Sequence, residues 1–360
     1  MNKPKVIAFY LPQFHPIPEN DEWWGKGFTE WTNVGKAKPL FKGHYQPRIP
    51  ADLGYYDLRV PEVREEQVTL AKEAGVEGFC YWHYWFGNGK QLIERPFNEV
   101  LDTGKPDFPF CLGWANHSWY AKTWESKGND KLLIEQLYND SEEHFKYLLK
   151  AFKDTRYIKY DNKPLLIVFD AKSLPGEYMN RLNNMARDNG LDGICFIGIS
   201  KSESDYSLLR QKGYSYFLPE RISNVATSKN IFIRRLYQIK NIFFRRPVNC
   251  FTYKEAIPYF TNDLLDVKED VIPMIIPQWD HSPRSAGKGL ILHKSSPILF
   301  KKHVENVFSI LKKKDQRFVF LKSWNEWAEG NYIEPDLKWG KQYINVLRGV
   351  IDKFVNNTSV

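Results

Sequence analysis

Short runs of apolar residues, each bounded by polar or turn-forming residues, recur along the whole chain. Eight of them have the length and composition of β-strands: Val6–Phe14, Val76–Phe86, Phe108–Ala115, Leu165–Asp170, Ile194–Ser200, Tyr214–Pro219, Ile272–Trp279 and Phe318–Trp324. Most are apolar throughout instead of alternating, which is typical of strands that are covered on both faces.

Segments with helical periodicity lie between these runs: Pro61–Ala74, Gln91–Asp102, Ser141–Lys153, Glu177–Asn189, Glu203–Lys212, Tyr253–Leu265, Lys301–Lys314 and Gly340–Phe354. Eight strands that alternate with eight helices predict an α/β fold, a (β/α)8 barrel that forms a single domain over residues 1–360. The alternative is an open doubly wound sheet. A glycine-rich phosphate turn normally follows the first strand of such a sheet, and this sequence has none there.

Three of the connections that follow strands are long, namely residues 15–59, 116–140 and 220–252. The last contains a basic insertion at about 221–252. In a barrel, all loops after strands emerge at the catalytic face. We therefore expect these long connections to build a substrate cleft at that face.

The stretch 322–336, K-S-W-N-E-W-A-E-G-N-Y-I-E-P-D, directly follows the last apolar run. It places Glu326 and Glu329 three residues apart, with Trp324 and Trp327 on either side of Glu326. Core packing does not call for this arrangement, because burying an unpaired carboxylate is costly. Sugar chemistry does, since one carboxyl group acts as an acid, a second is ionised, and aromatic faces hold the sugar ring. A solvated loop with surface glutamates is the alternative.

Other predicted strands also end in polar and aromatic residues, whose hydroxyl, amide, imidazole and ring groups are suited to binding sugars. Most could also be structural, and the aromatic run at strand two could be core between strands and helices. The candidate substrate-binding residues are Tyr10, Gln13, His15 and Trp31 after strand one, Tyr81, His83, Tyr84 and Trp85 at strand two, Trp114, Asn116 and His117 at strand three, Trp279, Asp280 and Arg284 at strand seven, and Trp324, Asn325 and Trp327 at strand eight.

Two of these groups leave alternatives open. Asp280 and Arg284 could bind a charged or hydroxyl-rich ligand, or they could form a structural ion pair with each other. His83, His117 and His281 could converge on a zinc ion, but no H-x-H or H-E-x-x-H motif supports such a site. We therefore expect no metal and no cofactor.

The net charge of +8 permits an anionic partner. Much of the positive charge lies in residues 234–246, and no nucleic-acid-binding signature accompanies it, so we expect no nucleic-acid partner. As a helix, this segment would mix apolar and cationic residues in the way that suits an anionic membrane surface. The alternative is a helix packed on the barrel with solvated basic residues. No signal peptide is visible and the four cysteines form no metal-type pair, so we expect a cytoplasmic protein, at the inner face of the membrane if this segment binds lipid.

With these residues in view, the chain resembles the WbsX-type family, which is described as glycosyltransferases of surface-polysaccharide clusters. That family is related to family 99 of the glycoside hydrolases, the endo-α-mannosidase barrels. The motifs that carry the resemblance are F-Y-L-P-Q-F-H (Phe9–His15), G-F-T-E-W-T-N-V (Gly27–Val34), Y-W-H-Y-W-F (Tyr81–Phe86), W-D-H-S-P-R (Trp279–Arg284) and W-N-E-W-A-E-G (Trp324–Gly330).

The resemblance implies roles for the two glutamates. Glu329 would be the general acid that protonates the leaving oxygen and later activates the incoming acceptor. Glu326 would be the base that takes a proton from the 2-hydroxyl of the sugar, which attacks the anomeric carbon through a 1,2-anhydro intermediate and gives retention. The spacing of the two residues alone does not distinguish this route from double displacement.

Three classes of function remain. The first is a retaining glycosidase that acts on a polysaccharide or a lipid-linked oligosaccharide. The second is a WbsX-type glycosyltransferase of lipopolysaccharide O-antigen or capsule biosynthesis, although no Asp-x-Asp motif or nucleotide-binding turn is found. A transglycosylase would combine the two. The third is a non-catalytic sugar-binding barrel. The presence of both Glu326 and Glu329 argues against this class.

Overall fold

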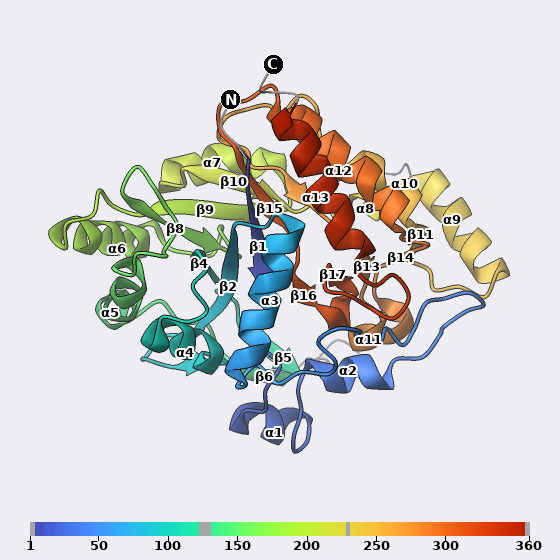
Figure 1. Ribbon diagram of the computed structural model, residues 1–360, viewed down its shortest axis with the longest axis horizontal. Helices are drawn as coiled ribbons and strands as arrows, with labels where there is room; N and C mark the ends of the chain where they lie inside the picture. The colour runs from blue at the N-terminus through green and yellow to red at the C-terminus, as the bar shows by residue number, and fades with distance from the viewer. Residues whose placement is uncertain (1–3, 122–130, 228–230, 357–360) are drawn as a thin grey trace. The chain divides into compact units, whose positions relative to one another are not determined.

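A computed structural model describes residues 4–121, 131–227 and 231–356 (Figure 1). Strands and helices follow one another along the chain in the order expected of a (β/α)8 barrel. The chain divides into two compact units. The first unit comprises Met1–Phe14, Thr29–Glu77 and Glu220–Val360, and the second comprises His15–Phe28 and Gly78–Pro219.

The second unit is built on parallel strands in the spatial order β2 (Gly78–Trp85), β4 (Phe110–Trp114), β8 (Lys163–Val168), β9 (Cys195–Ser200) and β10 (Tyr216–Pro219). Every residue of β2, β4 and β9 is buried, which explains why these runs are apolar without alternation. Its helices are α1 (Pro18–Trp24), α4 (Arg95–Thr103), α5 (Ser141–Phe152), α6 (Gly176–Asp188) and α7 (Tyr206–Lys212), with a 3-10 turn, η1 (Glu203–Asp205). Short antiparallel additions are also found among the described residues of this unit: β3 (Gln91–Leu92) on β2, β7 (Lys159–Tyr160) on β8, and the pair β5 (Trp119–Ala121) and β6 (Lys131–Ile134).

In the first unit, β15 (Phe318–Leu321) lies between β1 (Lys5–Tyr10) and β12 (Met274–Ile275), and all three strands are parallel. Two small sheets accompany them: β11 (Cys250–Thr252), β14 (Ile291–His293) and β13 (Trp279–Asp280) form one, and β16 (Asn325–Glu326) and β17 (Asn331–Tyr332) form the other. The helices are α2 (Glu30–Lys36), α3 (Pro61–Ala74), α8 (Asn224–Thr227), α9 (Ile231–Phe243), α10 (Tyr253–Phe260), α11 (Ser282–Ser285), α12 (Pro297–Leu311) and α13 (Gln342–Asn356), with 3-10 turns η2 (Ala286–Lys288) and η3 (Trp327–Glu329).

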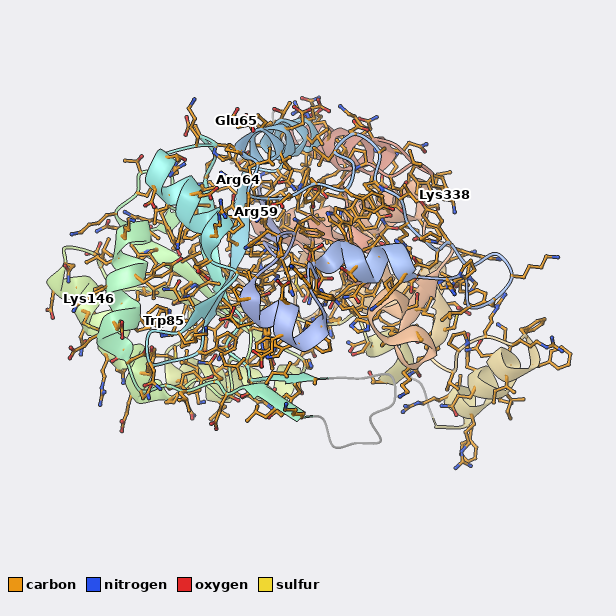
Figure 2. The ribbon with its side chains drawn as sticks, turned by 90° about the horizontal axis from the view of Figure 1, so that it is seen from below. Arg59, Arg64, Glu65, Trp85, Lys146 and Lys338 are labelled. Atoms are coloured by element: carbon orange, nitrogen blue, oxygen red, sulfur yellow. The ribbon has the colours of Figure 1, made fainter. Side chains whose placement is uncertain are left out.

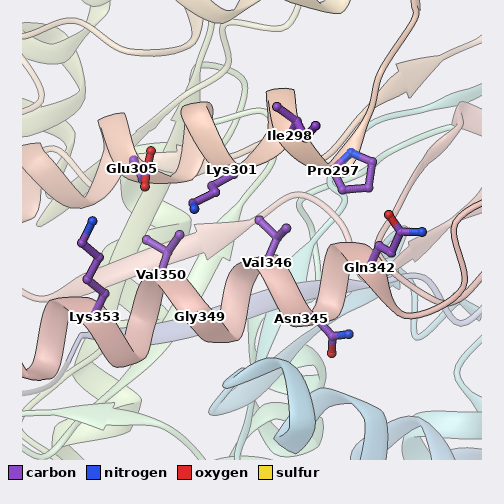
Figure 3. A pocket seen from close by; sticks show the side chains of 10 residues that line it. All are labelled: Pro297, Ile298, Lys301, Glu305, Gln342, Asn345, Val346, Gly349, Val350 and Lys353. Carbon is purple, nitrogen blue, oxygen red and sulfur yellow. The ribbon is translucent and has the colours of Figure 1, made fainter.

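Helices α3, α13 and α12 pack side by side in the first unit (Figure 1). Two adjacent residues of α3 lie on different faces of the helix. Arg64 is buried and donates a hydrogen bond to the Leu58 carbonyl, whereas Glu65 is exposed to solvent (Figure 2). A groove of about 450 Å³ runs between α12 and α13 (Figure 3). The charged side chains along it, including Lys301 and Lys353, are exposed, so this groove is a feature of the helical surface.

Seven of the eight predicted strands are confirmed, with ends that differ by a few residues. The seventh prediction, Ile272–Trp279, is wrong in part. Only Met274–Ile275 pairs with β15, whereas Trp279 and Asp280 pair in the antiparallel direction with β14. Pro277, which has no N–H to donate, stands between the two pairings and interrupts the strand.

Candidate active site

The candidate site is formed by the chain that follows β15 in the first unit. After Leu321 the chain forms β16, turns through η3 and returns as β17. Gly330 closes this turn with a φ of +55°. A Cβ atom at this position would lie 2.8 Å from the Cβ of Asp280 and 3.0 Å from the Cζ of Arg48. Both the backbone conformation and the close packing therefore require glycine here.

Glu326 ends β16 and Glu329 ends η3, so the turn brings the two carboxyl groups together in a hydrogen bond. Glu326 is only 6% exposed, and the side chain of Glu329 is 15% exposed. Arg284 of α11 forms an ion pair with Oε1 of Glu329. The Nε2 atom of His281 lies 3.7 Å from the same oxygen. The turn thus holds two neighbouring carboxyl groups with unequal electrostatic surroundings.

Burial raises the pKa of Glu326 well above its ordinary value, and the neighbouring carboxylate of Glu329 raises it further. Burial also disfavours ionisation of Glu329, but the positive charge of Arg284, with a contribution from His281, outweighs it and lowers the pKa of Glu329 to about 2. The pKa of Glu326 therefore lies well above that of Glu329, so Glu326 is the member of the pair that keeps its proton to the higher pH. Neighbouring carboxyl groups with separated pKa values are the arrangement that acid–base chemistry needs.

Arg284 also binds Glu30, a residue that the sequence analysis did not select. Its Nη2 lies 3.0 Å from Oε1 of Glu30, and its Nε donates to Oε2 at 3.3 Å. Glu30 is the first residue of α2, directly after the capping residue Thr29, and it is buried. The sequence signal that could have identified Glu30 is its position in the G-F-T-E-W motif, directly before the candidate Trp31. One guanidinium therefore bridges two carboxylates from distant parts of the chain.

Asp280 does not pair with Arg284, so that alternative for the two residues is wrong. It accepts hydrogen bonds from Nε2 of His44 and Nε2 of Gln46, both at 2.8 Å, and lies 3.7 Å from Nη2 of Arg48. Burial alone would raise the pKa of Asp280, but the hydrogen bond from His44 and the charge of Arg48 lower it to about 2. The residues 44–48 and the strand end at Asp280 are joined by this buried carboxylate.

Replacing Asp280 with Asn should therefore lower stability in a pH-dependent way. The pKa of about 2, against 3.8 in the unfolded chain, contributes about 2 kcal/mol at pH 7. This contribution is present above pH 3.8 and is lost as the pH falls toward 2, because the wild-type carboxylate is then protonated. Denaturant unfolding at pH 7 and at pH 2.5 should show a difference between the two proteins that shrinks at the lower pH. An equal difference at both values would mean that the effect comes from packing alone.

Another buried carboxyl group, that of Glu334, holds side chains around the turn and was also not selected from the sequence. It accepts hydrogen bonds from the indole N–H of Trp327 at 2.6 Å, from the hydroxyl of Tyr56 at 2.9 Å and from Nε2 of Gln67 at 2.7 Å. Burial raises the pKa of Glu334 to about 7, although these hydrogen bonds favour the ionised form and oppose the rise. The hydroxyl of the candidate Tyr10 donates to Gln67 at 2.6 Å, so Tyr10 belongs to this supporting network.

The remaining candidates of the first unit surround the same turn. Asn325 exchanges two hydrogen bonds with the backbone of Leu11, at 2.7 and 3.0 Å, and so joins the turn to the end of β1. Trp327 stacks on Tyr332 with ring centroids 3.7 Å apart and contacts Trp31 at 5.5 Å. The other placements are as follows: Trp324 is fully buried, Trp279 is buried and stacks on His281, and Gln13 is half-buried.

The candidates of the second unit form their own cluster around β2. Nε2 of His83 lies 3.0 Å from Nε2 of His144 on α5, and burial lowers the pKa of His83 to about 3, so His83 is neutral. Trp85 stacks on His144 with ring centroids 4.7 Å apart; Trp85 and Lys146 of α5 are labelled in Figure 2. The indole N–H of Trp114 donates a hydrogen bond to the Trp85 carbonyl, with 2.9 Å between nitrogen and oxygen. These side chains pack between the strands and α5.

The opposite face of β2 bears Trp82 and Tyr84. The ring of Trp82 packs against that of Phe169 with centroids 5.8 Å apart, and the ring of Tyr84 packs against that of Trp119 with centroids 5.3 Å apart. Trp82 was not among the sequence candidates, although the alternation of the strand places it with Tyr84. The other candidates of this unit are placed as follows: Tyr81 contacts Phe97, Asn116 bonds the hydroxyl of Tyr138 and the backbone of Asp170, His117 contacts Phe169, and His15 is buried.

Comparison with known proteins gives the family. The sequence pattern of the family described as Glycosyltransferase WbsX matches residues 6–347. The chain belongs to the WbsX glycosyltransferase family. Two curated relatives, both called "Uncharacterized protein WxcX" and from two strains of Xanthomonas campestris pv. campestris, are 36% and 35% identical over 97% of this chain. The chain spans about half the length of these curated relatives.

Solved structures similar to this WbsX-family chain show its fold. Two structures of the family 99 endo-α-mannosidase from Bacteroides thetaiotaomicron have TM-scores of 0.62 and 0.60 and 15% sequence identity, and they cover 99% of this chain and 98% of theirs. A structure called "Glycoside hydrolase-like protein" has a TM-score of 0.61 at 15% identity and covers 98% of this chain and 94% of its own. The predicted (β/α)8 barrel is thereby confirmed.

Proposed function

We propose that this WbsX-family protein is an enzyme that cleaves or transfers glycosidic bonds with retention, acting on a surface polysaccharide or a lipid-linked glycan. The observation that carries the proposal is the buried, hydrogen-bonded Glu326–Glu329 pair, in which burial raises the pKa of Glu326 and the charge of Arg284 lowers the pKa of Glu329. Trp31, which contacts the buried Trp327, is half-buried and keeps part of its ring exposed, and such a ring face can stack on a sugar. Family membership and the barrel fold agree with this chemistry.

In the proposed reaction, the proton of the pair moves from Glu326 to Glu329 along their hydrogen bond as Arg284 shifts toward Glu30. Glu329 then protonates the glycosidic oxygen as its bond to the anomeric carbon breaks. Glu326, now a carboxylate, takes the proton of the 2-hydroxyl, whose oxygen bonds to the anomeric carbon. Water or an acceptor hydroxyl opens this 1,2-anhydro sugar and gives its proton to Glu329, while the 2-oxygen regains its proton from Glu326.

The position of the proton depends on Arg284, and this dependence can be measured without a substrate. In Glu326→Gln, Glu329 should stay ionised at pH 4.5, because its ion pair with Arg284 remains. Adding Arg284→Gln should raise the pKa of Glu329 above 4.5, since burial then acts unopposed, whereas adding Arg284→Lys should keep it low. Infrared titration of the protonated-carboxyl band, taken as the difference from the matching variants that also carry Glu329→Gln, would report this. A protonated Glu329 near neutral pH in Glu326→Gln alone would contradict the electrostatic account.

The alternative is a glycosyltransferase of lipopolysaccharide O-antigen or capsule biosynthesis, which the description of the family favours. Both activities would be tested by incubating the purified protein with the surface glycan of its source organism and with nucleotide sugars. Oligosaccharide released without a nucleotide sugar would identify hydrolysis, and nucleotide release that depends on an acceptor would identify transfer. Glycan binding without either product, in wild type and in Glu329→Gln alike, would indicate a binding barrel and contradict the enzymatic proposal.

We further propose that the protein works in peripheral contact with an anionic membrane, at the cytoplasmic face. Such contact would bring a lipid-linked glycan to the site. The support for it is the basic and apolar insertion that contains α9, in the same unit as the carboxyl pair.

A further inference from the structure

Helix α9 exposes its largest apolar side chains. Phe232, Leu236, Ile239 and Phe243 are 71%, 65%, 62% and 80% exposed. Their spacing of four, three and four residues places them in one stripe along the helix, which we call the outer stripe. Large apolar side chains gathered in one exposed patch mark an interaction surface, whereas single ones need no explanation.

The opposite side of α9 is held on the protein. The hydroxyl of Tyr237 donates to Oε1 of Glu255 at 3.0 Å, and its ring lies 5.6 Å from that of Phe251. Nδ2 of Asn241 donates to the carbonyls of Val248 and Cys250, at 3.1 and 2.9 Å. Tyr237 and Asn241 are four residues apart, so both lie on one face and fix the rotation of the helix. The outer stripe is therefore directed away from the protein. The helix is packed on the protein with exposed basic residues, as the alternative expects, but that packing leaves the outer stripe uncovered.

The charges around the outer stripe indicate what it binds. Residues 231–246 contain five arginines and lysines and no aspartate or glutamate. Arg235 and Lys240 lie beside the stripe and are exposed. Long cationic side chains next to an inserted apolar stripe can reach lipid phosphates while their stems remain in the apolar layer. No helix in the described part of the chain is long and apolar enough to cross a bilayer.

We infer that α9 docks the protein on an anionic lipid bilayer, with the outer stripe in the acyl–headgroup boundary and Arg235 and Lys240 at the phosphates. This deepens the proposed membrane contact by naming the element, its inserted face and its lipid chemistry. A second copy of the chain is the competing occupant of an exposed apolar stripe. The cations on the stripe's flanks favour the bilayer, because two copies would bring like charges together.

The position of α9 also connects docking with the candidate site. The guanidinium of Arg246, just beyond α9, lies 5.4 Å from the ring of Phe41, which stacks on His44 at 4.6 Å. His44 in turn donates to Asp280, on the strand that precedes α11. The docked helix would therefore lie close to the segment that supports the carboxyl pair, which suits a substrate held in the membrane.

The test is sedimentation with vesicles of phosphatidylglycerol and phosphatidylcholine, compared with vesicles of phosphatidylcholine alone. Wild type should bind the anionic vesicles at low ionic strength and be released by salt. Leu236→Gln with Phe243→Gln, and separately Arg235→Gln with Lys240→Gln, should each reduce binding at least tenfold. The matched control is Leu264→Gln with Ile298→Gln, which changes two apolar residues outside α9 that are at least as exposed as Leu236 and Phe243, and it should bind as wild type does.

Three results would overturn the inference. The first is no binding of wild type to anionic vesicles at low salt, and the second is equal binding by the outer-stripe variant. The third is a concentration-dependent dimer that the outer-stripe variant abolishes, which would assign the stripe to a second copy. Vesicle binding requires no glycan, so its failure is separable from failure of the proposed enzymatic function, which a soluble glycan tests independently.

Discussion

Replacing Glu329 with Gln should reduce turnover by about 10²–10⁴-fold on a substrate with a poor leaving group, the usual size of a general-acid contribution. An amide has nearly the same shape as the carboxyl group but cannot donate its proton to the leaving oxygen. A substrate with an activated leaving group needs less protonation, so the variant should retain much of its activity on it. Steady-state kinetics on the two substrate classes would measure the difference.

The experiment needs a control for structural damage, because replacing Glu329 also removes its ion pair with Arg284. Glu334→Gln changes another buried carboxyl group of the same turn region, but one that bonds Trp327 and Tyr56 and is not an ion-pair partner of Arg284 in the described contacts. It should reduce activity on both substrate classes to the same extent. Near-wild-type activity of Glu329→Gln on the poor leaving group would show that the acid is another residue.

Replacing Glu326 with Gln should abolish turnover on both substrate classes. In the proposed reaction Glu326 removes the proton of the 2-hydroxyl, and bond formation at the anomeric carbon depends on that step whatever the leaving group. The opposite responses of the two variants to an activated leaving group would therefore separate the base from the acid. Initial rates for both variants on the same pair of substrates are the measurement.

A substrate that lacks its 2-hydroxyl tests the same step from the side of the sugar. Wild type should not turn it over, since the internal nucleophile is missing. A glycosyl ester trapped on Glu326 would establish double displacement and contradict the 2-hydroxyl route. Rescue of Glu326→Gln by an activated leaving group would exchange the two roles, in agreement with the raised pKa of Glu326.

Local pattern was enough to find the carboxyl pair. The apolar run that ends at Leu321 predicts a buried strand, and the residues that follow it must leave the strand end together. Because Glu326 and Glu329 are close in sequence, no long-range information was needed to place them near each other. The same holds for the repeated alternation of strands and helices, which predicts the barrel. The seventh strand was predicted less well, since the pairing of Trp279 with Leu292 depends on a sheet that local periodicity does not reveal.

Tertiary structure alone decided which carboxyl group of the pair has the lower pKa. Glu30 and Arg284 are 254 residues apart, and Arg284 and Glu329 are 45 apart, so no spacing rule connects them. Their meeting lowers the pKa of Glu329, while burial raises the pKa of Glu326, which is the reverse of the order that an acid at Glu329 and a base at Glu326 would suggest for the free protein. A pKa depends on burial and on the charges nearby in space, and a linear sequence contains neither quantity.

Side-chain direction divides in the same way between sequence and structure. Alternation along β2 separates His83 and Trp85 from Trp82 and Tyr84, but only contacts such as that of His83 with His144 on α5 show which face is packed against a helix. In 231–246 the sequence determined an apolar and cationic helix. The hydrogen bonds of Tyr237 and Asn241 decided its rotation, and therefore which apolar residues remain outside. Periodicity determines which residues share a face, and the partners present in space determine where that face points.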